Sequence, residues 1–304
     1  MNRFAPIFII LAAMLWGVDG IVLRPSLYSL PVALVVFVES AIVAVYLSPI
    51  LIKNPKELKS LKSIDWLAFA GVALFGGAIG TMAITKALFY VNFVNLSIVI
   101  LIQKLQPVFA LILAALILRE KLSKKFFFWA ALAIIGAYFM TFGLQFPVFD
   151  TGDKTLAAAA FSLLAAFSFA FSTILSKRAL KNVSFEMGTY LRFFITTFIM
   201  MIIVLALGQF STVGSISSKQ TIIFLIIAFT TGGPAIFIYY YGLKRTAASV
   251  STIAELAFPL TAVILEYAIR KNLLDFVQWI GVVVLVFSIL KVTRLNIKKE
   301  SNIL

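Results

Sequence analysis

The chain has 304 residues, is 62% hydrophobic and 12% charged, lacks both Cys and His, and has a formal net charge of +14. Soluble domains are about 25% charged, so these few polar side chains could not cover a globule in water, and we expect an integral membrane protein. Without Cys and His the chain can form no His–Cys zinc site, disulfide, thiolate nucleophile or His-dependent triad. We expect no metal and no cofactor.

The high positive charge could also indicate nucleic-acid binding, which requires Lys and Arg clustered on one face or element. Here these residues come in short groups between apolar runs. That pattern is typical of the loops of a membrane protein, so we expect a lipid bilayer and no nucleic acid as partner.

Ten apolar segments have the roughly 20 residues that a helix needs to cross a bilayer. In chain order they are 6–24, 31–52, 65–88, 93–118, 125–146, 155–176, 185–207, 220–243, 247–269 and 274–293. None of them alternates apolar and polar residues as a β-barrel strand requires. The predicted fold is therefore an all-α membrane protein with ten transmembrane helices.

The Lys and Arg residues of the connections predict the orientation. The N-terminus and every second connection hold 18 of the 26, the other connections hold six, and Lys104 and Arg192 lie inside spans. Arg24 counts among the six in this assignment. By the positive-inside rule, we expect both termini on the cytoplasmic side of the inner membrane.

An internal repeat relates the two halves of the chain. Residues 103–110 and 255–262 lie 152 residues apart, so that Pro107 aligns with Pro259 and Gln103 with Glu255. The repeat predicts two five-helix units, residues 1–150 and 151–304, the second inserted upside down because five is odd. Inverted repeats are typical of secondary transporters, although chance similarity between apolar helices can produce such a match.

A family resemblance rests on three stretches, which are Ala13 to Gly17, Ala87-Leu88 through Gln106–Phe109, and Leu118 to Leu122. Together they resemble the signature of the EamA family of drug/metabolite transporters. The resemblance implies ten helices in two inverted halves that carry small metabolites. The chain departs from the family pattern at Glu39, where members commonly carry Arg, and at Lys271-Asn272, where they usually have Gly-Glu.

Five charged residues fall well inside predicted spans: Asp19, Glu39, Lys104, Arg192 and Glu255. Each would cost about 2.5–3.5 kcal/mol at the bilayer centre, so each is a functional candidate. Glu39 has only apolar neighbours on its own helix, and we expect it to pair with Lys104 or Arg192. The pair could be a permanent structural contact, or one partner could be exchanged for substrate or a proton during transport.

Polar side chains precede a proline in both halves. Gln103 and Gln106 lie beside Pro107, with Lys104 next to them, and Glu255 lies one turn before Pro259. Proline frees a backbone carbonyl that must be covered or line a cavity. We expect Lys104 to hold an anionic group and Glu255 a cationic group or a proton, which would suit a zwitterion such as an amino acid. Helix kinking alone would also explain the prolines.

Glycines and aromatic residues complete the candidate site. Gly77 and the Gly232-Gly233-Pro234 group predict either close helix packing or a hinge beside the site. Trp16, Tyr239 and Tyr240 lie where an aromatic ring could face a cavity and stack on a substrate.

The predicted function is a secondary transporter, and more specifically an exporter, that moves a small polar metabolite by alternating access. No phosphate-binding loop of the G-x-x-x-x-G-K-[ST] type occurs, so we expect neither direct ATP use nor an ATPase subunit. Protons could couple through Glu255, Glu39 or Asp19, or transport could be uncoupled. An intramembrane enzyme acting on lipid or prenyl substrates and a channel are the competing hypotheses.

Overall fold

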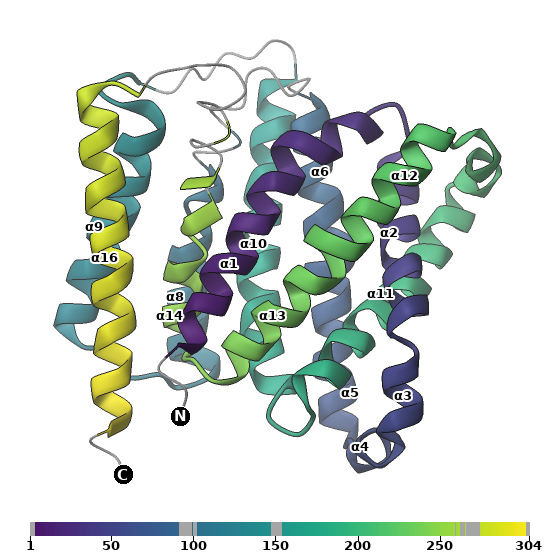
Figure 1. Ribbon diagram of the computed structural model, residues 1–304, viewed down its shortest axis with the longest axis horizontal. Coiled ribbons are helices and arrows are strands. Elements are labelled where there is room, and N and C mark those ends of the chain that lie inside the picture. Colours follow the sequence, from purple (N-terminus) through teal and green to yellow (C-terminus); the bar gives the residue numbers. More distant parts are fainter. Residues whose placement is uncertain are drawn as a thin grey trace.

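The computed structural model describes residues 4–90, 99, 102–146, 154–258, 260–261, 265 and 274–301. All the regular secondary structure in these residues is helical (Figure 1). The first half contains α1 (Ala5–Val18), η1 (Asp19–Leu23), η2 (Arg24–Leu27), α2 (Val32–Leu47), α3 (Pro49–Lys53), α4 (Pro55–Ser60), α5 (Ser63–Gly71), η3 (Val72–Ile79), α6 (Gly80–Tyr90), α8 (Gln106–Ile117) and α9 (Lys124–Phe142).

The second half begins with a long helix inside the bundle and ends with a helix at its edge. It contains α10 (Thr155–Ala179), α11 (Phe185–Ala206), η4 (Gln209–Ser215), α12 (Ser218–Ile227), η5 (Ala228–Gly232), α13 (Gly233–Lys244), α14 (Ala248–Ala254) and α16 (Phe276–Ser301).

Eight helices in the described residues are long and apolar enough to cross a membrane. They are Ala5–Leu27, Val32–Lys53, Ser63–Tyr90, Lys124–Phe142, Leu156–Ala179, Phe185–Ala206, Ser218–Lys244 and Phe276–Leu295. Their outer faces carry exposed apolar side chains such as Val45, Ile202 and Val283. Such a surface suits lipid rather than water.

The eight helices coincide with eight of the ten predicted spans. The predicted spans 93–118 and 247–269 lie partly outside the described residues, which retain the apolar helix α8 from the first and α14 from the second. The number ten therefore stays a prediction. The membrane-protein class is supported, since the described fold is entirely helical and apolar.

Three spans contain a π-helical turn in place of regular α-helix. One is η1, and the other two, η3 and η5, coincide with the glycine-rich segments that hold Gly77 and Gly232. Neither glycine segment breaks its helix, because both spans continue through it, and Pro234 lies in the first turn of α13, where proline is common. The π turns change the direction of the side chains that follow them.

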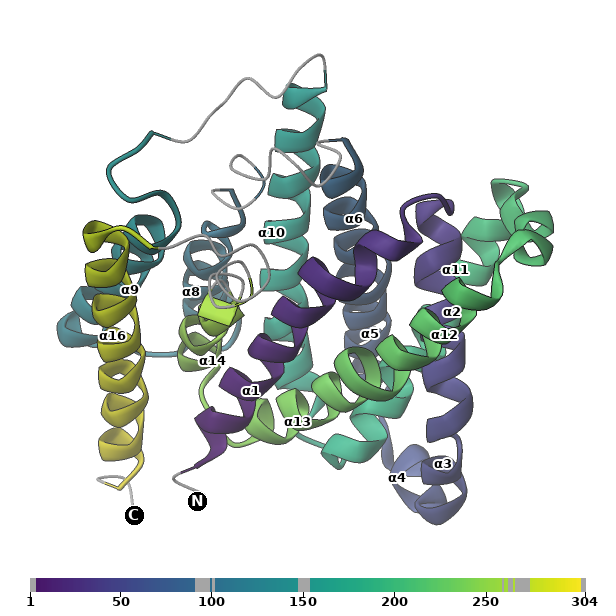
Figure 2. The same ribbon diagram turned by 45° about the horizontal axis from the view of Figure 1, so that its top comes forward.

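The helices pack as neighbouring pairs around a central space. α1 packs on α13, α2 on α11, α6 on α10, and α9 on α16. Figures 1 and 2 show α9 and α16 side by side at one edge of the bundle, with α2 and α11 at the other edge. The start of α1 and the end of α16 lie at the same end of the molecule (Figure 1).

The close packing of α9 and α16 depends on two glycines, one on each helix, and each faces the backbone of the other helix. A Cβ atom at Gly136 would lie 2.7 Å from the backbone N of Leu285, and one at Gly281 would lie 2.8 Å from the Cα of Met140. These distances are shorter than any ordinary carbon contact, so any larger side chain would force the helices apart. Small residues allow helices to approach closely in this way within membranes.

We expect Gly281→Ala to destabilise the protein by about 1–3 kcal/mol, the usual cost of overpacking. Thermal unfolding in detergent measures the effect as a lower midpoint temperature. Gly214→Ala is the matched control, because a Cβ atom there meets nothing within 4 Å. Equal midpoints for the two variants would contradict this account of the helix pair.

Candidate functional site

A cavity of about 350 Å³ lies in the central space of the bundle. Its walls come from both halves of the chain, from Trp16 on α1 to Phe258 beyond α14, whereas α9 and α16 contribute no lining residue. Eight of the charged, amide and aromatic residues predicted for the site line it: Trp16, Asp19, Glu39, Gln103, Lys104, Arg192, Tyr239 and Glu255. Pro107, Gly77 and Gly232 line it too.

Glu255 joins the two halves of the chain at one side of the cavity. Its carboxylate accepts a hydrogen bond from the Tyr239 hydroxyl at 2.6 Å and another from the Gln106 amide at 2.8 Å. Thr173 lies 3.1 Å from the same Tyr239 oxygen. We call Glu255, Tyr239 and Gln106 the Glu255 junction. Two charge-assisted hydrogen bonds hold this carboxylate in the cavity wall, and in the described part of the chain it forms no salt bridge.

A second carboxylate positions Glu255 from outside the cavity. Glu255 directly follows α14, whose first backbone N–H groups would otherwise have no partner. The Glu120 carboxylate accepts from the backbone N of Ala248 at 2.9 Å and from that of Ser249 at 3.2 Å. Since Glu120 belongs to the first half of the chain, this contact also ties the two halves together.

Lys104 is a buried cation without a bonded partner. The residue is 5% exposed, and its Nζ atom has no hydrogen-bond acceptor in the described part of the chain. It lies 5.9 Å from the centre of the Phe142 ring. Its neighbour Gln103 instead donates to the backbone oxygen of Ser162 at 2.9 Å. Burial of an unpaired ammonium is costly unless another group supplies the missing charge.

The aromatic residues of the site divide between cavity and core. The rings of Trp16 and Tyr239 are in contact, with centroids 5.2 Å apart, and both line the cavity. Tyr240 is fully buried and does not line it, so the expectation that Tyr240 faces a substrate is not met. Its hydroxyl lies 2.9 Å from that of Ser176 and accepts from Arg192 at 3.4 Å.

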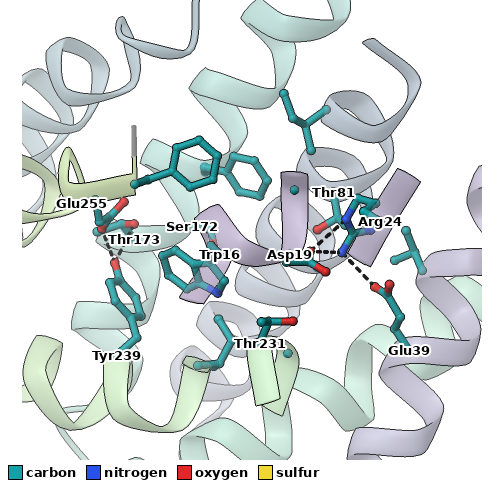
Figure 3. A pocket seen from close by; sticks show the side chains of 18 of the residues that line it. Trp16, Asp19, Arg24, Glu39, Thr81, Ser172, Thr173, Thr231, Tyr239 and Glu255 are labelled. Atoms are coloured by element: carbon teal, nitrogen blue, oxygen red, sulfur yellow. Dashed lines mark hydrogen bonds and ion pairs between the residues drawn. The ribbon is translucent and has the colours of Figure 1, made fainter. Parts of the chain in front are cut away.

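The prediction that Glu39 pairs with Lys104 or Arg192 is wrong. Glu39 accepts from the Arg24 guanidinium at 3.3 Å, and Arg192 instead donates to the backbone oxygen of Gly76. Arg24 also binds Asp19 through two N–H groups, at 2.9 and 2.6 Å. Figure 3 shows Asp19, Arg24 and Glu39, which we call the ion cluster, on the opposite side of Trp16 from Glu255.

The sequence assignment missed Arg24 because it ended the first helix there and placed this residue in a connection. The chain continues instead through the π turn η1 into the 3-10 helix η2, and the Arg24 backbone N–H donates to the carbonyl of Asp19, five residues earlier. This i→i+5 geometry brings residues 19 and 24 to the same face. The spacing of five between two opposite charges was the available signal.

Two other predicted residues fall outside the cavity. Gly233 and Pro234 begin α13 without lining it, and a Cβ atom at Gly233 would lie 2.8 Å from the Tyr46 ring carbon that carries the hydroxyl. Pro259 lies outside the described residues. In the described part of the chain, the proline with a place in the cavity wall is Pro107.

The chain is similar to several known proteins in sequence and in fold. The EamA-like transporter family model matches residues 3–142 and, separately, residues 156–294. A riboflavin transporter, ImpX, of Fusobacterium nucleatum is 44% identical over 95% of this chain and 97% of its own. An uncharacterized transporter of Synechocystis is 28% identical over 75% of this chain and 66% of its own.

A solved crystal structure has the same fold, with a TM-score of 0.73 over 99% of this chain and 100% of that one, at 15% identity. The family resemblance seen in the sequence is thus confirmed, and the relatives are transporters rather than enzymes. With both matches together covering nearly the whole chain, the protein is a multi-pass membrane transporter of the EamA-like family.

Proposed function

We propose that the protein is a carrier for a flavin-type molecule, with riboflavin itself as the first substrate to test. The observation that supports this most is the 44% identity to a riboflavin transporter over nearly the full length of both chains. The cavity volume of about 350 Å³ falls within the range of roughly 300–1,000 Å³ that small-molecule sites occupy.

The chemistry of the cavity suits the parts of such a substrate. A flavin has a flat aromatic ring system, one edge with carbonyl acceptors and an N–H donor, and a chain of hydroxyl groups. Trp16 and Tyr239 offer faces for stacking, Lys104 a donor for a carbonyl, and Glu255 an acceptor for an N–H. Hydroxyls of the lining Ser and Thr residues would bind the polyol chain.

An amino acid is the second candidate substrate, because Lys104 and Glu255 carry opposite charges in the same cavity. Such a ligand would use the two charges but leave the aromatic wall empty. The 44% identity to a riboflavin transporter favours the flavin. Binding measurements with both classes of ligand distinguish them directly.

The mechanism we propose is alternating access between two inverted five-helix halves, residues 1–150 and 151–304, in the inner membrane with both termini in the cytoplasm. The separate family matches in the two halves support a repeat. The contacts between halves at Gln106–Glu255 and Glu120–Ala248 would be the ones that rearrange. Export is the direction that the family resemblance favours.

Purified protein should bind riboflavin, and we expect its unfolding temperature to rise in proportion to the logarithm of ligand excess. Labelled riboflavin should also show saturable counterflow in proteoliposomes, as a carrier does and a channel does not. Stabilisation by amino acids with none by riboflavin would replace the flavin by the second candidate.

Trp16→Ala should weaken riboflavin binding roughly two- to tenfold, since an aromatic contact contributes about 0.5–1.5 kcal/mol beyond its buried area. Quenching of flavin fluorescence on titration gives the dissociation constant. The matched control is Trp279→Ala, because Trp279 is 57% exposed on α16, away from the cavity. Similar losses in both variants would remove Trp16 from the site.

Lys104→Met should raise the unfolding temperature of the ligand-free protein by a few degrees while lowering transport. Replacing a buried charge that has no partner by an apolar group of similar length removes its desolvation cost. Lys219→Met, at an exposed position on α12, should change neither quantity. A Lys104→Met protein that is less stable yet fully active would show that the ammonium serves the fold alone.

A further inference from the structure

The ion cluster carries more negative than positive charge, and we propose that it binds one proton, on Glu39, in each transport cycle. This site would be separate from the substrate groups at the Glu255 junction. The inference rests on the proposed function in one respect, namely that the protein works as a carrier. It assigns the proton to one of the three acids that the sequence left open.

The charge balance of the cluster supports this assignment. Two carboxylates, Asp19 and Glu39, share the single guanidinium of Arg24, and the side chains of all three are only 11–12% exposed. One negative charge is therefore in excess. An uncompensated charge in such surroundings costs far more than a neutral acid does. A proton on one carboxyl would leave a neutral cluster.

The hydrogen bonds indicate which carboxyl takes the proton. Arg24 binds Asp19 through two N–H groups at 2.9 and 2.6 Å, whereas its one bond to Glu39 is 3.3 Å long. Asp19 is thus the better compensated of the two. The buried Oε1 of Glu39 has no hydrogen-bond partner in the described part of the chain, so it can accept a proton without breaking a contact.

The other charged groups around the cavity are Lys104, Arg192 and Glu255. None of these forms an ion pair with the cluster among the described residues, where the two Arg24 contacts are the salt bridges present. They contribute only across the cavity space, so the local balance of two acids and one base decides the protonation of Glu39.

A metal cation fits the cluster less well than a proton does. Hard cations such as Ca²⁺ bind 6–8 oxygen ligands, but here the guanidinium already occupies one oxygen of each carboxylate. Its positive charge would also repel a second cation. The remaining free oxygens are Asp19 Oδ1 and Glu39 Oε1.

The location of the cluster links protonation to helix movement. Asp19 and Arg24 lie on the turns η1 and η2 that end the first span, and Glu39 lies on α2. A neutral Glu39 holds Arg24 more weakly than a carboxylate does. Gain of the proton would therefore loosen the contact between the first two spans, and its loss would tighten it. This contact lies beside Trp16, which lines the same cavity (Figure 3).

The test uses purified full-length protein in proteoliposomes that contain a pH-sensitive dye. A riboflavin gradient should drive proton movement through the wild-type protein, and Glu39→Gln should lower this flux at least tenfold. Riboflavin counterflow, which requires no net proton transfer, should remain measurable in Glu39→Gln. Glu39→Asp keeps an acid at the position and should retain proton flux.

Glu186→Gln is the matched control, because this acid lies in the first turn of α11 outside the cavity lining, and it should behave as the wild-type protein does. Counterflow without riboflavin-driven proton flux in the wild type would overturn the proton site and leave the carrier function intact. A flux that follows a sodium gradient would overturn it as well. Absence of riboflavin counterflow in the wild-type protein would instead contradict the proposed substrate.

A measurement on the ligand-free protein keeps the proposal testable if no substrate is transported. Protonation should relieve the excess charge, so the unfolding temperature of the wild type should rise from mildly alkaline to mildly acidic pH. Glu39→Gln should lack that rise. The same pH profile in Glu39→Gln and wild type would exclude Glu39 as the proton acceptor.

Discussion

The cost of burying charge in a bundle of apolar helices governs the interior of this protein. A charge there is removed from bulk water, so each ionised group needs a partner from the chain or from a ligand. Arg24 meets this need for Asp19 but only in part for Glu39, and one hydroxyl donor and one amide donor meet it for Glu255. Among the described residues, Lys104 has no such partner. The central cavity thus contains compensated and uncompensated charges side by side.

Those partnerships also determine how the two halves of the chain meet. Gln106 and Glu120 come from the first half, and each contacts the segment from Ala248 to Glu255 in the second half. One contact lies in the cavity wall and the other caps the start of α14. A change at either contact is therefore transmitted directly to the position of the carboxylate that faces the cavity.

Much of this could be predicted from the sequence, because apolar runs of bilayer length and charges within them are local signals. Eight spans and the lining positions of the charged residues Lys104 and Glu255 agree with those signals. Pairing across the bundle does not. Lys104 and Arg192 lay at suitable depth for Glu39, but the order of helices around the cavity places Arg24 beside it instead.

The error at Arg24 has a definite physical cause. Counting helix length at 1.5 Å per residue presumes regular α-helix throughout, whereas η1 adds one residue to a turn and η2 tightens the next. Tyr240 was misplaced for a different reason. Tyr239 and Tyr240 are both buried, but Tyr239 lines the cavity whereas the Tyr240 hydroxyl packs against Ser176 and Arg192, and the sequence does not distinguish these positions.

The close pair of α9 and α16 has a consequence for how this protein can diversify. The two helices meet through Gly136 and Gly281 and contribute no residue to the described cavity lining. The close contact between their backbones can therefore keep the sequences of these two helices constant while residues of the cavity wall change. A new substrate preference can arise in such a protein by substitutions in the remaining helices, at no expense to this part of its framework.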